Sequence, residues 1–131
     1  MARLILVRHG KSEWNKKGLW TSLTDIDLAE EGVTEARRAG MALVDFPIHR
    51  AHTSLLKRAQ QTLHHIKEVL GKKFDTKAHS ALNERNYGDY TGKNKWELRD
   101  QLGEELFNRI RRGWKEPIPN GETLEDVYQR A

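Results

Sequence analysis

The sequence has no cysteine among its 131 residues. Disulfide bonds, thiolate nucleophiles and cysteine-based zinc sites are therefore excluded, and any acid, base or nucleophilic chemistry falls to histidine and carboxylate side chains. Long apolar runs are missing too, and the start "MARLILVRHG" lacks the apolar core and small-residue cleavage site of a secretory signal. We therefore expect a cytoplasmic protein with no membrane partner.

Long basic runs are also absent, although the net charge is +4 and the isoelectric point is about 9.4. A basic balance is typical either of a nucleic-acid surface or of cations gathered around a small anion. Because the charges are dispersed and no recognition motif is present, we expect no nucleic acid partner. Tight, steeply salt-dependent binding to DNA would revive that alternative.

The spacing of apolar residues predicts alternating strands and helices. Leu4–Val7 is a continuous apolar run, typical of a strand buried on both faces of a parallel sheet. After it we expect a helix over 31–45, a strand within 48–54, a helix over 55–70 capped by Thr53 or Ser54 and ended by Gly71, a strand within 74–82, a helical stretch over 95–114 interrupted near Gly103, and a helix capped by Thr123. This order predicts a single α/β domain over 1–131, with a mostly parallel sheet flanked by helices.

Arg8, His9 and Gly10 directly follow the first apolar run. Ligands of parallel sheets bind beyond the carboxyl ends of the strands, so these residues stand where a site is expected. A neutral imidazole is a nucleophile suited to phosphorus, a guanidinium holds phosphate oxygens, and glycine lets the backbone approach a ligand closely. An isolated "RHG" is equally typical of a strand end that meets solvent, so the tripeptide alone leaves the function open.

Longer stretches narrow this choice. In order and spacing, "RHGKSEWN", "TDIDLAEEGVTEARRAG", "TSLLKRAQQT", "LNERNYGDYTGKNK" and "RIRRGW" resemble the cofactor-dependent phosphoglycerate mutases of the histidine phosphatase superfamily. "RHG" marks only the superfamily, whereas "LNERNYG" followed by "GKNK" and paired arginines is more specific to the mutases. The resemblance implies a phosphoglycerate mutase-like fold and a role in glycolysis and gluconeogenesis. It also implies interconversion of 3- and 2-phosphoglycerate through a phosphohistidine primed by 2,3-bisphosphoglycerate, without a metal.

The resemblance also implies roles for individual residues. His9 matches the residue that is phosphorylated, and Arg8 and Arg58 match its phosphate ligands. Glu84 matches the proposed general acid and base that exchanges a proton with the substrate hydroxyl. The positions that match substrate-binding residues are Asn15, Thr21, Ser22, Tyr87, Lys95, Arg111 and Arg112. The family usually has glycine where Ser22 stands, so we expect an added side chain near the ligand.

Two groups of residues allow a plainer interpretation. A substrate that carries a phosphate and a carboxylate needs several cations, but Arg111 and Arg112 are equally typical of a solvated helix face. His64 and His65 lie beside the apolar face of the second predicted helix, where packing or surface placement is the simpler expectation. Since no spacing such as "HExxH" is present, we assign no metal.

The sequence departs from the family at the second catalytic histidine. The resemblance implies this residue in an "AHG"-like motif on a later strand, and nothing after Arg112 matches it. We therefore expect a truncated chain that lacks its C-terminal portion and has little mutase turnover alone. A histidine phosphatase and a catalytically impaired anion-binding domain stay open as alternatives. The expected partner is a small-molecule phosphorylated substrate, and a homo-oligomer stays open.

Overall fold

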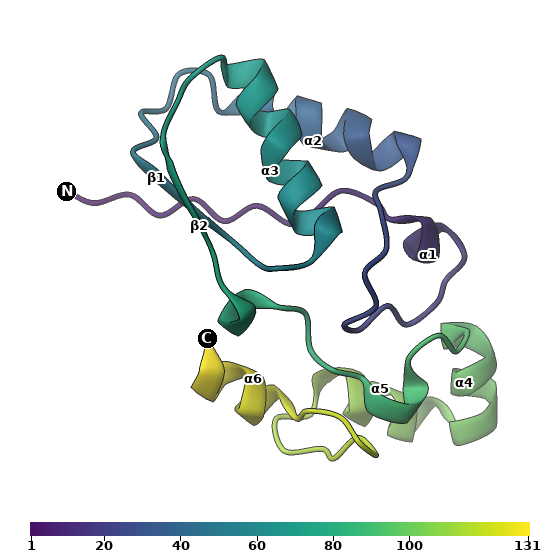
Figure 1. Cartoon of the computed structure of the whole chain (residues 1–131). Coiled ribbons are helices and arrows are strands. Elements are labelled where there is room, and N and C mark those ends of the chain that lie inside the picture. The colour runs from purple at the N-terminus through teal and green to yellow at the C-terminus, as the bar shows by residue number, and fades with distance from the viewer.

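The structure is a computed structural model that describes residues 1–131. Two groups of elements lie one above the other in Figure 1. The upper group contains α2 (Glu30–Ala42), β1 (Arg50–Thr53), α3 (Lys57–Leu70) and β2 (Asp75–Ala78). The lower group contains α4 (Lys95–Leu102), α5 (Glu104–Arg112) and α6 (Leu124–Arg130). The short helix α1 (Glu13–Lys16) and the 3₁₀ turns η1 (Ser80–Leu82) and η2 (Gly88–Tyr90) lie in the connections.

The two strands form a parallel sheet in which Arg50 lies opposite Asp75 and Thr53 lies opposite Ala78. Helix α3 connects the two strands and packs against α2. A parallel pair joined by a helix is the βαβ arrangement that the sequence predicts. The α/β class and both of these strands are therefore confirmed, although each strand is shorter than its predicted segment.

The predicted first strand is wrong for this chain. Leu4–Val7 belongs to no strand and makes no backbone-to-backbone hydrogen bond. Leu4 and Leu6 are 82% and 86% exposed, and the purple N-terminal segment crosses the sheet region as an unpaired trace in Figure 1. The apolar pattern shows that these residues are suited to burial, but a buried strand also needs hydrogen-bonding neighbours. The sheet contains only β1 and β2.

Three of the predicted helix boundaries are confirmed, whereas α2 ends at Ala42 rather than at residue 45 and α5 ends at Arg112 rather than at residue 114. Gly71 ends α3 in the left-handed conformation with φ 58°, and Gly103, with φ 83°, separates α4 from α5. Thr123 accepts a hydrogen bond from the backbone of Asp126 in a capping box at the start of α6.

The predicted cap of α3 is wrong. Neither Thr53 nor Ser54 occupies the N-cap position, which belongs to Leu56 and has no side-chain hydrogen bond. Ser54 instead accepts a hydrogen bond from the backbone N–H of Leu56, before the helix begins. A hydroxyl can satisfy either a turn or a helix N-terminus, and here it satisfies the turn.

The main hydrophobic core lies in the lower group and consists of Trp20, Leu98, Phe107, Ile110 and Ile118. It joins α4 and α5 to the loop that contains Trp20, and the Trp20 ring packs edge-on against Phe107 at 6.0 Å. This core fixes the two helices on which Lys95 and Arg111 stand. No helix of the structure combines the length and apolar composition that crossing a bilayer would require.

Candidate active site

The backbone after His9 is held by contacts with α2 and α3. The N–H of Gly10 donates to Oγ1 of Thr62 at 3.0 Å, and the N–H of Lys11 donates to Oε2 of Glu35 at 2.8 Å. A Cβ on Gly10 would lie 2.2 Å from the carbonyl oxygen of Gly32. Glycine is therefore required at position 10 because the loop lies directly against the start of α2.

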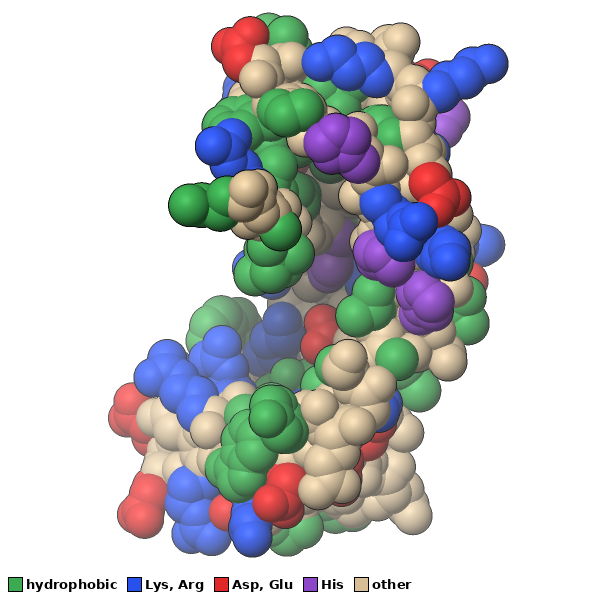
Figure 2. Space-filling model, turned by 90° about the vertical axis from the view of Figure 1, so that its left-hand side faces the viewer, with side chains coloured by type: hydrophobic (Ala, Val, Ile, Leu, Met, Phe, Trp, Pro, Cys, Tyr) green, Lys and Arg blue, Asp and Glu red, His purple; other side chains and the backbone are tan.

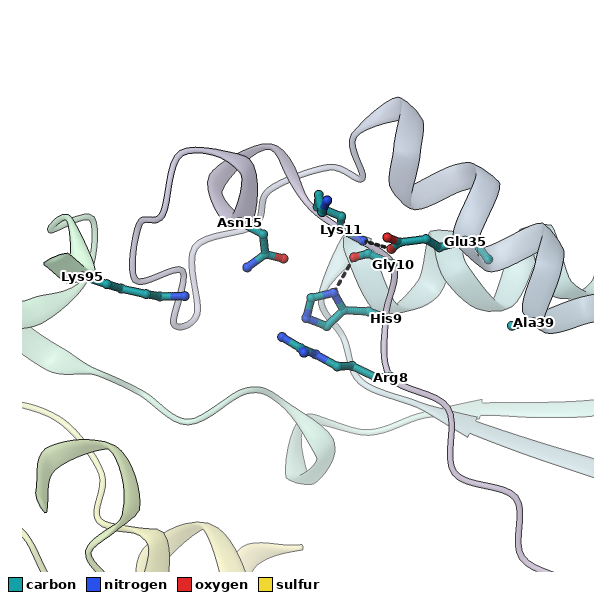
Figure 3. A pocket seen from close by; sticks show the side chains of 9 residues that line it. Arg8, His9, Gly10, Lys11, Asn15, Glu35, Ala39 and Lys95 are labelled. Atoms are coloured by element: carbon teal, nitrogen blue, oxygen red, sulfur yellow. Dashed lines mark hydrogen bonds between the residues drawn. The ribbon is translucent and has the colours of Figure 1, made fainter. Parts of the chain in front are cut away.

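Asn15 is placed by the short helix α1. Its backbone N–H donates to Oγ of Ser12, and its Oδ1 accepts from the N–H of Ser12, so the two residues form a reciprocal capping box. Ser12 is fully buried. The Asn15 side chain extends into the space beside His9 (Figure 3), where its amide NH₂ remains available as a donor.

The imidazole of His9 is held in one orientation. Its Nδ1 lies 2.7 Å from the carbonyl oxygen of Gly10. Because a carbonyl only accepts, Nδ1 carries the proton and Nε2 keeps a free lone pair in the neutral ring. Burial, followed by the charges of Arg58 and Arg8, lowers the pKa of His9, while the Gly10 hydrogen bond and Glu84 oppose this shift. The neutral form of the ring is therefore favoured near pH 7.

Four of the predicted site residues line one cavity of about 470 Å³, namely Arg8, His9, Asn15 and Lys95. Figure 3 shows Arg8 beside the His9 ring and Lys95 entering from the opposite side. Figure 2 shows the hollow between the upper and lower parts of the molecule, with Lys and Arg side chains gathered along its lower wall. The cavity therefore combines a free imidazole nitrogen with cations contributed from separate segments.

Lys95 connects the lower group to the cavity. It is the first residue of α4, and Asn94 caps this helix by accepting hydrogen bonds from two backbone N–H groups. The pKa of Lys95 is lowered by burial and by the neighbouring charges of Arg111 and Arg8, and Glu84 opposes this shift. Cations that repel one another in this way gain most from a shared multivalent anion.

Arg58 lies outside the cavity lining and is only 1% exposed. Its guanidinium donates to the carbonyl oxygens of Thr24 at 3.0 Å and Ser22 at 2.9 Å. Burial lowers the pKa of Arg58, while Glu84 and Asp25 oppose this shift. Arg58 thus holds the 22–24 loop and adds positive charge near His9.

The side chain of Ser22 is buried and forms its hydrogen bonds within the protein. Ser22 has φ 53°, which is the left-handed region that favours glycine. Its Oγ accepts from the N–H of Tyr87 at 2.8 Å and donates to Oδ1 of Asn86 at 3.3 Å. The neighbouring Thr21 hydroxyl is buried without a hydrogen-bond partner. Neither residue lines the cavity.

Glu84 is the carboxylate that faces these cations. Its Oε1 accepts from the N–H of Arg85 at 3.0 Å. Its charge raises the pKa of His9, Arg58 and Lys95 against the effect of their burial. Glu84 is exposed and does not line the cavity, and the one carboxylate that does, Glu35, accepts the N–H of Lys11.

The remaining predicted residues, Tyr87, Arg111 and Arg112, do not line the cavity. Burial, followed by Glu84, raises the pKa of Tyr87, whose ring lies 4.2 Å from that of Trp20. Arg111 is exposed in the last turn of α5 and lies close enough to lower the pKa of Lys95. Arg112 is exposed in the same turn and does not line the cavity.

Sequence reasoning missed several lining residues, namely Lys11, Glu35, Ala36 and Ala39. Lys11 could have been found from its place within "RHGKSEWN". The α2 residues gave no such signal, because they reach the cavity through tertiary contacts, the close approach of Gly10 to Gly32 and the hydrogen bond from Lys11 to Glu35.

The sequence profile described as "Histidine phosphatase superfamily (branch 1)" matches residues 4–131. The chain therefore belongs to the histidine phosphatase superfamily. It is 48% identical to a 2,3-bisphosphoglycerate-dependent phosphoglycerate mutase of Bartonella tribocorum, over 97% of this chain and 63% of that protein. It is also 48% identical to the mutase of the same name from Bradyrhizobium diazoefficiens, over 98% of this chain and 63% of that protein. The chain thus spans less than two thirds of the length of these relatives.

Solved structures show the same architecture. Bacillus stearothermophilus YhfR superposes with a TM-score of 0.82 and 28% identity, over 94% of this chain and 60% of that chain. A putative alpha-ribazole-5'-P phosphatase from Escherichia coli superposes with a TM-score of 0.77 and 26% identity, over 95% of this chain and 60% of that chain. The predicted phosphoglycerate mutase-like fold class and family membership are confirmed.

Proposed function

We propose that the protein containing this sequence is a 2,3-bisphosphoglycerate-dependent phosphoglycerate mutase in which His9 carries the transferred phosphoryl group. The observation that carries the proposal is the 2.7 Å contact between Nδ1 of His9 and the Gly10 carbonyl, which leaves Nε2 free. Names of relatives at 48% identity support the choice of reaction.

The cations present fit a bisphosphorylated ligand. Arg8 and Lys95 line the cavity from opposite sides, while Arg58 and Arg111 add positive charge nearby. A ligand with two phosphates and a carboxylate offers negative charge to each of these groups, and arginine presents the fork that matches phosphate oxygens. The 2,3-bisphosphoglycerate supplies the phosphoryl group that primes the enzyme.

The steps assigned to this chain are displacement and proton exchange. Nε2 of His9 attacks phosphorus, so that an N–P bond forms while the P–O bond to the departing oxygen breaks. Glu84, which has taken up the proton of the substrate hydroxyl in the preceding transfer, gives that proton to the departing oxygen. In the reverse step Glu84 accepts a proton from a substrate hydroxyl, which takes the phosphoryl group from His9. Arg8 and Arg58 stabilise the charge on the phosphoryl oxygens during both transfers.

The test is phosphohistidine formation in the full-length gene product treated with 2,3-bisphosphoglycerate. We expect an alkali-stable phosphoryl group on His9, detected by mass spectrometry, and its loss in His9→Ala together with a loss of mutase turnover of at least about a thousandfold. His64→Gln is the matched control, because that histidine is exposed on α3 and outside the cavity.

Two outcomes would contradict the proposal. Retained turnover in His9→Ala would remove His9 from the reaction. A ratio of isomerised phosphoglycerate to free phosphate below one would make the protein a phosphatase that uses the same histidine.

A further inference from the structure

Arg130, in the last turn of α6, contacts the backbone that leads to Glu84. Its guanidinium donates to the carbonyl oxygen of Ala81, to that of Asn83 at 2.9 Å and to that of Glu84 at 3.2 Å. Ala81 lies within η1, Asn83 is the C-cap of this turn and Glu84 follows it. One side chain therefore fixes three points along the segment that presents Glu84.

Glu122 holds Arg130 in this position. Its Oε1 accepts from Nε of Arg130 at 2.8 Å, and its Oε2 accepts from Nη2 at 3.0 Å. Oε2 also accepts from the backbone N–H of Asn86 at 2.8 Å. The pair is bidentate and both side chains are only 25% exposed, so its geometry is more restrained than that of an ordinary surface ion pair. The two residues hold the backbone on both sides of Glu84.

The Glu84 side chain has little support of its own. It is exposed, and its carboxylate accepts one hydrogen bond, from the N–H of the adjacent Arg85. Its position relative to His9 therefore depends on where the 81–86 backbone lies. Displacement of a catalytic group by about 1 Å can cost roughly a hundredfold in rate.

We propose that Arg130, held by Glu122, is a positioning residue that keeps the Glu84 carboxylate within reach of the ligand at His9. This inference rests on the proposed function, in which Glu84 transfers the proton. Arg130 itself lies outside the cavity that contains His9 and acts through the backbone that it binds.

The first test compares Arg130→Ala with Arg109→Ala in the full-length gene product. Arg109 also forms a two-point ion pair, with Glu116 at 3.1 Å for each contact, but it binds no carbonyl between 81 and 86. We expect kcat to fall by roughly ten- to a hundredfold in Arg130→Ala with KM nearly unchanged. Arg130→Lys should recover only part of this loss, since an ammonium lacks the planar fork. An Arg130→Ala rate equal to that of the control would overturn the proposal.

The second test asks whether Arg130 acts through Glu84. In a Glu84→Gln background, Arg130→Ala should cause little further loss of kcat, because the group that it positions is already gone. An equal fall in kcat in both backgrounds would show that Arg130 has a general structural role. This outcome would overturn the positioning role and leave the proposed function standing. Wild-type turnover in Glu84→Gln would overturn the proton-transfer role of Glu84 and, with it, the positioning role.

A milder variant covers the case in which Arg130→Ala folds poorly. Glu122→Gln keeps the volume of the side chain but removes the charge that holds Arg130. Faster amide hydrogen exchange at Asn86, together with the same dependence on Glu84, is the expected result. Unchanged exchange and unchanged kcat in Glu122→Gln would overturn the proposal.

Discussion

Leu4–Val7 and Gly10–Asn15 are close neighbours in the sequence, but the structure treats them in opposite ways. The first segment makes no backbone-to-backbone hydrogen bond, and its Leu4 and Leu6 are exposed. In the second, the backbone N–H groups of Gly10, Lys11 and Ser12 each have a side-chain acceptor. The loop at the site is therefore held by contacts with α1, α2 and α3.

The largest expected effect is that of Gly10→Ala, which changes a residue within the ordered Gly10–Asn15 segment. A Cβ at this position would lie 2.2 Å from the Gly32 carbonyl oxygen, so one backbone must move. We expect a loss of about 3 kcal/mol in the free energy of unfolding and roughly a hundredfold slower phosphorylation of His9. Thermal unfolding and single-turnover phosphorylation measure the two effects.

Gly71→Ala is the control for this change. It has φ 58° but no atom within 4 Å of the added Cβ, so we expect a loss of only about 1 kcal/mol and unchanged phosphorylation. Equal effects of the two variants would mean that the contact between Gly10 and Gly32 does not order the site.

Arg58→Ala tests the support of the site from α3. The change removes the guanidinium donors of the Ser22 and Thr24 carbonyl groups, and only Thr24 keeps another donor, the backbone N–H of Ile26. We expect about 2 kcal/mol of destabilisation and slower phosphorylation of His9, because the 22–24 loop and a nearby positive charge are both affected. Arg38→Ala, at an exposed position on α2, should change neither quantity. Full activity in Arg58→Ala would contradict this role.

His9 lies between the exposed Leu4–Val7 segment and the ordered Gly10–Asn15 segment, and its pKa reports on its surroundings there. Its pKa in the fold lies below the ordinary value of 6.5, chiefly because of burial and then because of Arg58 and Arg8. The unfolded chain therefore binds the proton more readily, and the contribution of His9 makes stability fall as the pH drops below about 6.5 toward the folded pKa.

An NMR titration of the His9 ring measures this shift. Arg8→Ala should raise the pKa while leaving it below the ordinary value, since burial remains the larger cause. Arg3→Ala removes a charge that lies over the Phe46 ring and should leave the titration unchanged. A downward shift in Arg8→Ala would show that the Arg8 charge does not act on His9 as described.

The smallest expected effect is that of Leu6→Ser. Leu6 is 86% exposed, so we expect less than about 0.5 kcal/mol of change in the chain described here. Leu98→Ala is the contrasting control, because Leu98 is 3% exposed within the main core and its truncation should cost about 2 to 5 kcal/mol. A large cost of Leu6→Ser, measured by denaturant unfolding, would mean that Leu6 is buried in solution.

Local signals in the sequence predicted much of the fold correctly. Gly71 and Gly103 end helices because glycine adopts positive φ without steric cost, and Thr123 begins one because its hydroxyl accepts a backbone N–H. The strand predicted over Leu4–Val7 was wrong because an apolar run is suited to burial but does not supply the strand that would pair with it. The prediction that Ser54 caps α3 was wrong because its hydroxyl accepts the backbone N–H of Leu56 instead.

The site shows the same division. The sequence by itself determined which functional groups Arg8, His9 and Glu84 carry and how far apart these residues lie along the chain. Only the tertiary structure decided that Nε2 of His9 is the free nitrogen and that Ser22 faces the Asn86–Tyr87 turn. The tautomer, the burial and the mutual electrostatics of these side chains depend on atoms from distant segments. The positions of those atoms are set by tertiary packing rather than by neighbouring residues in the sequence.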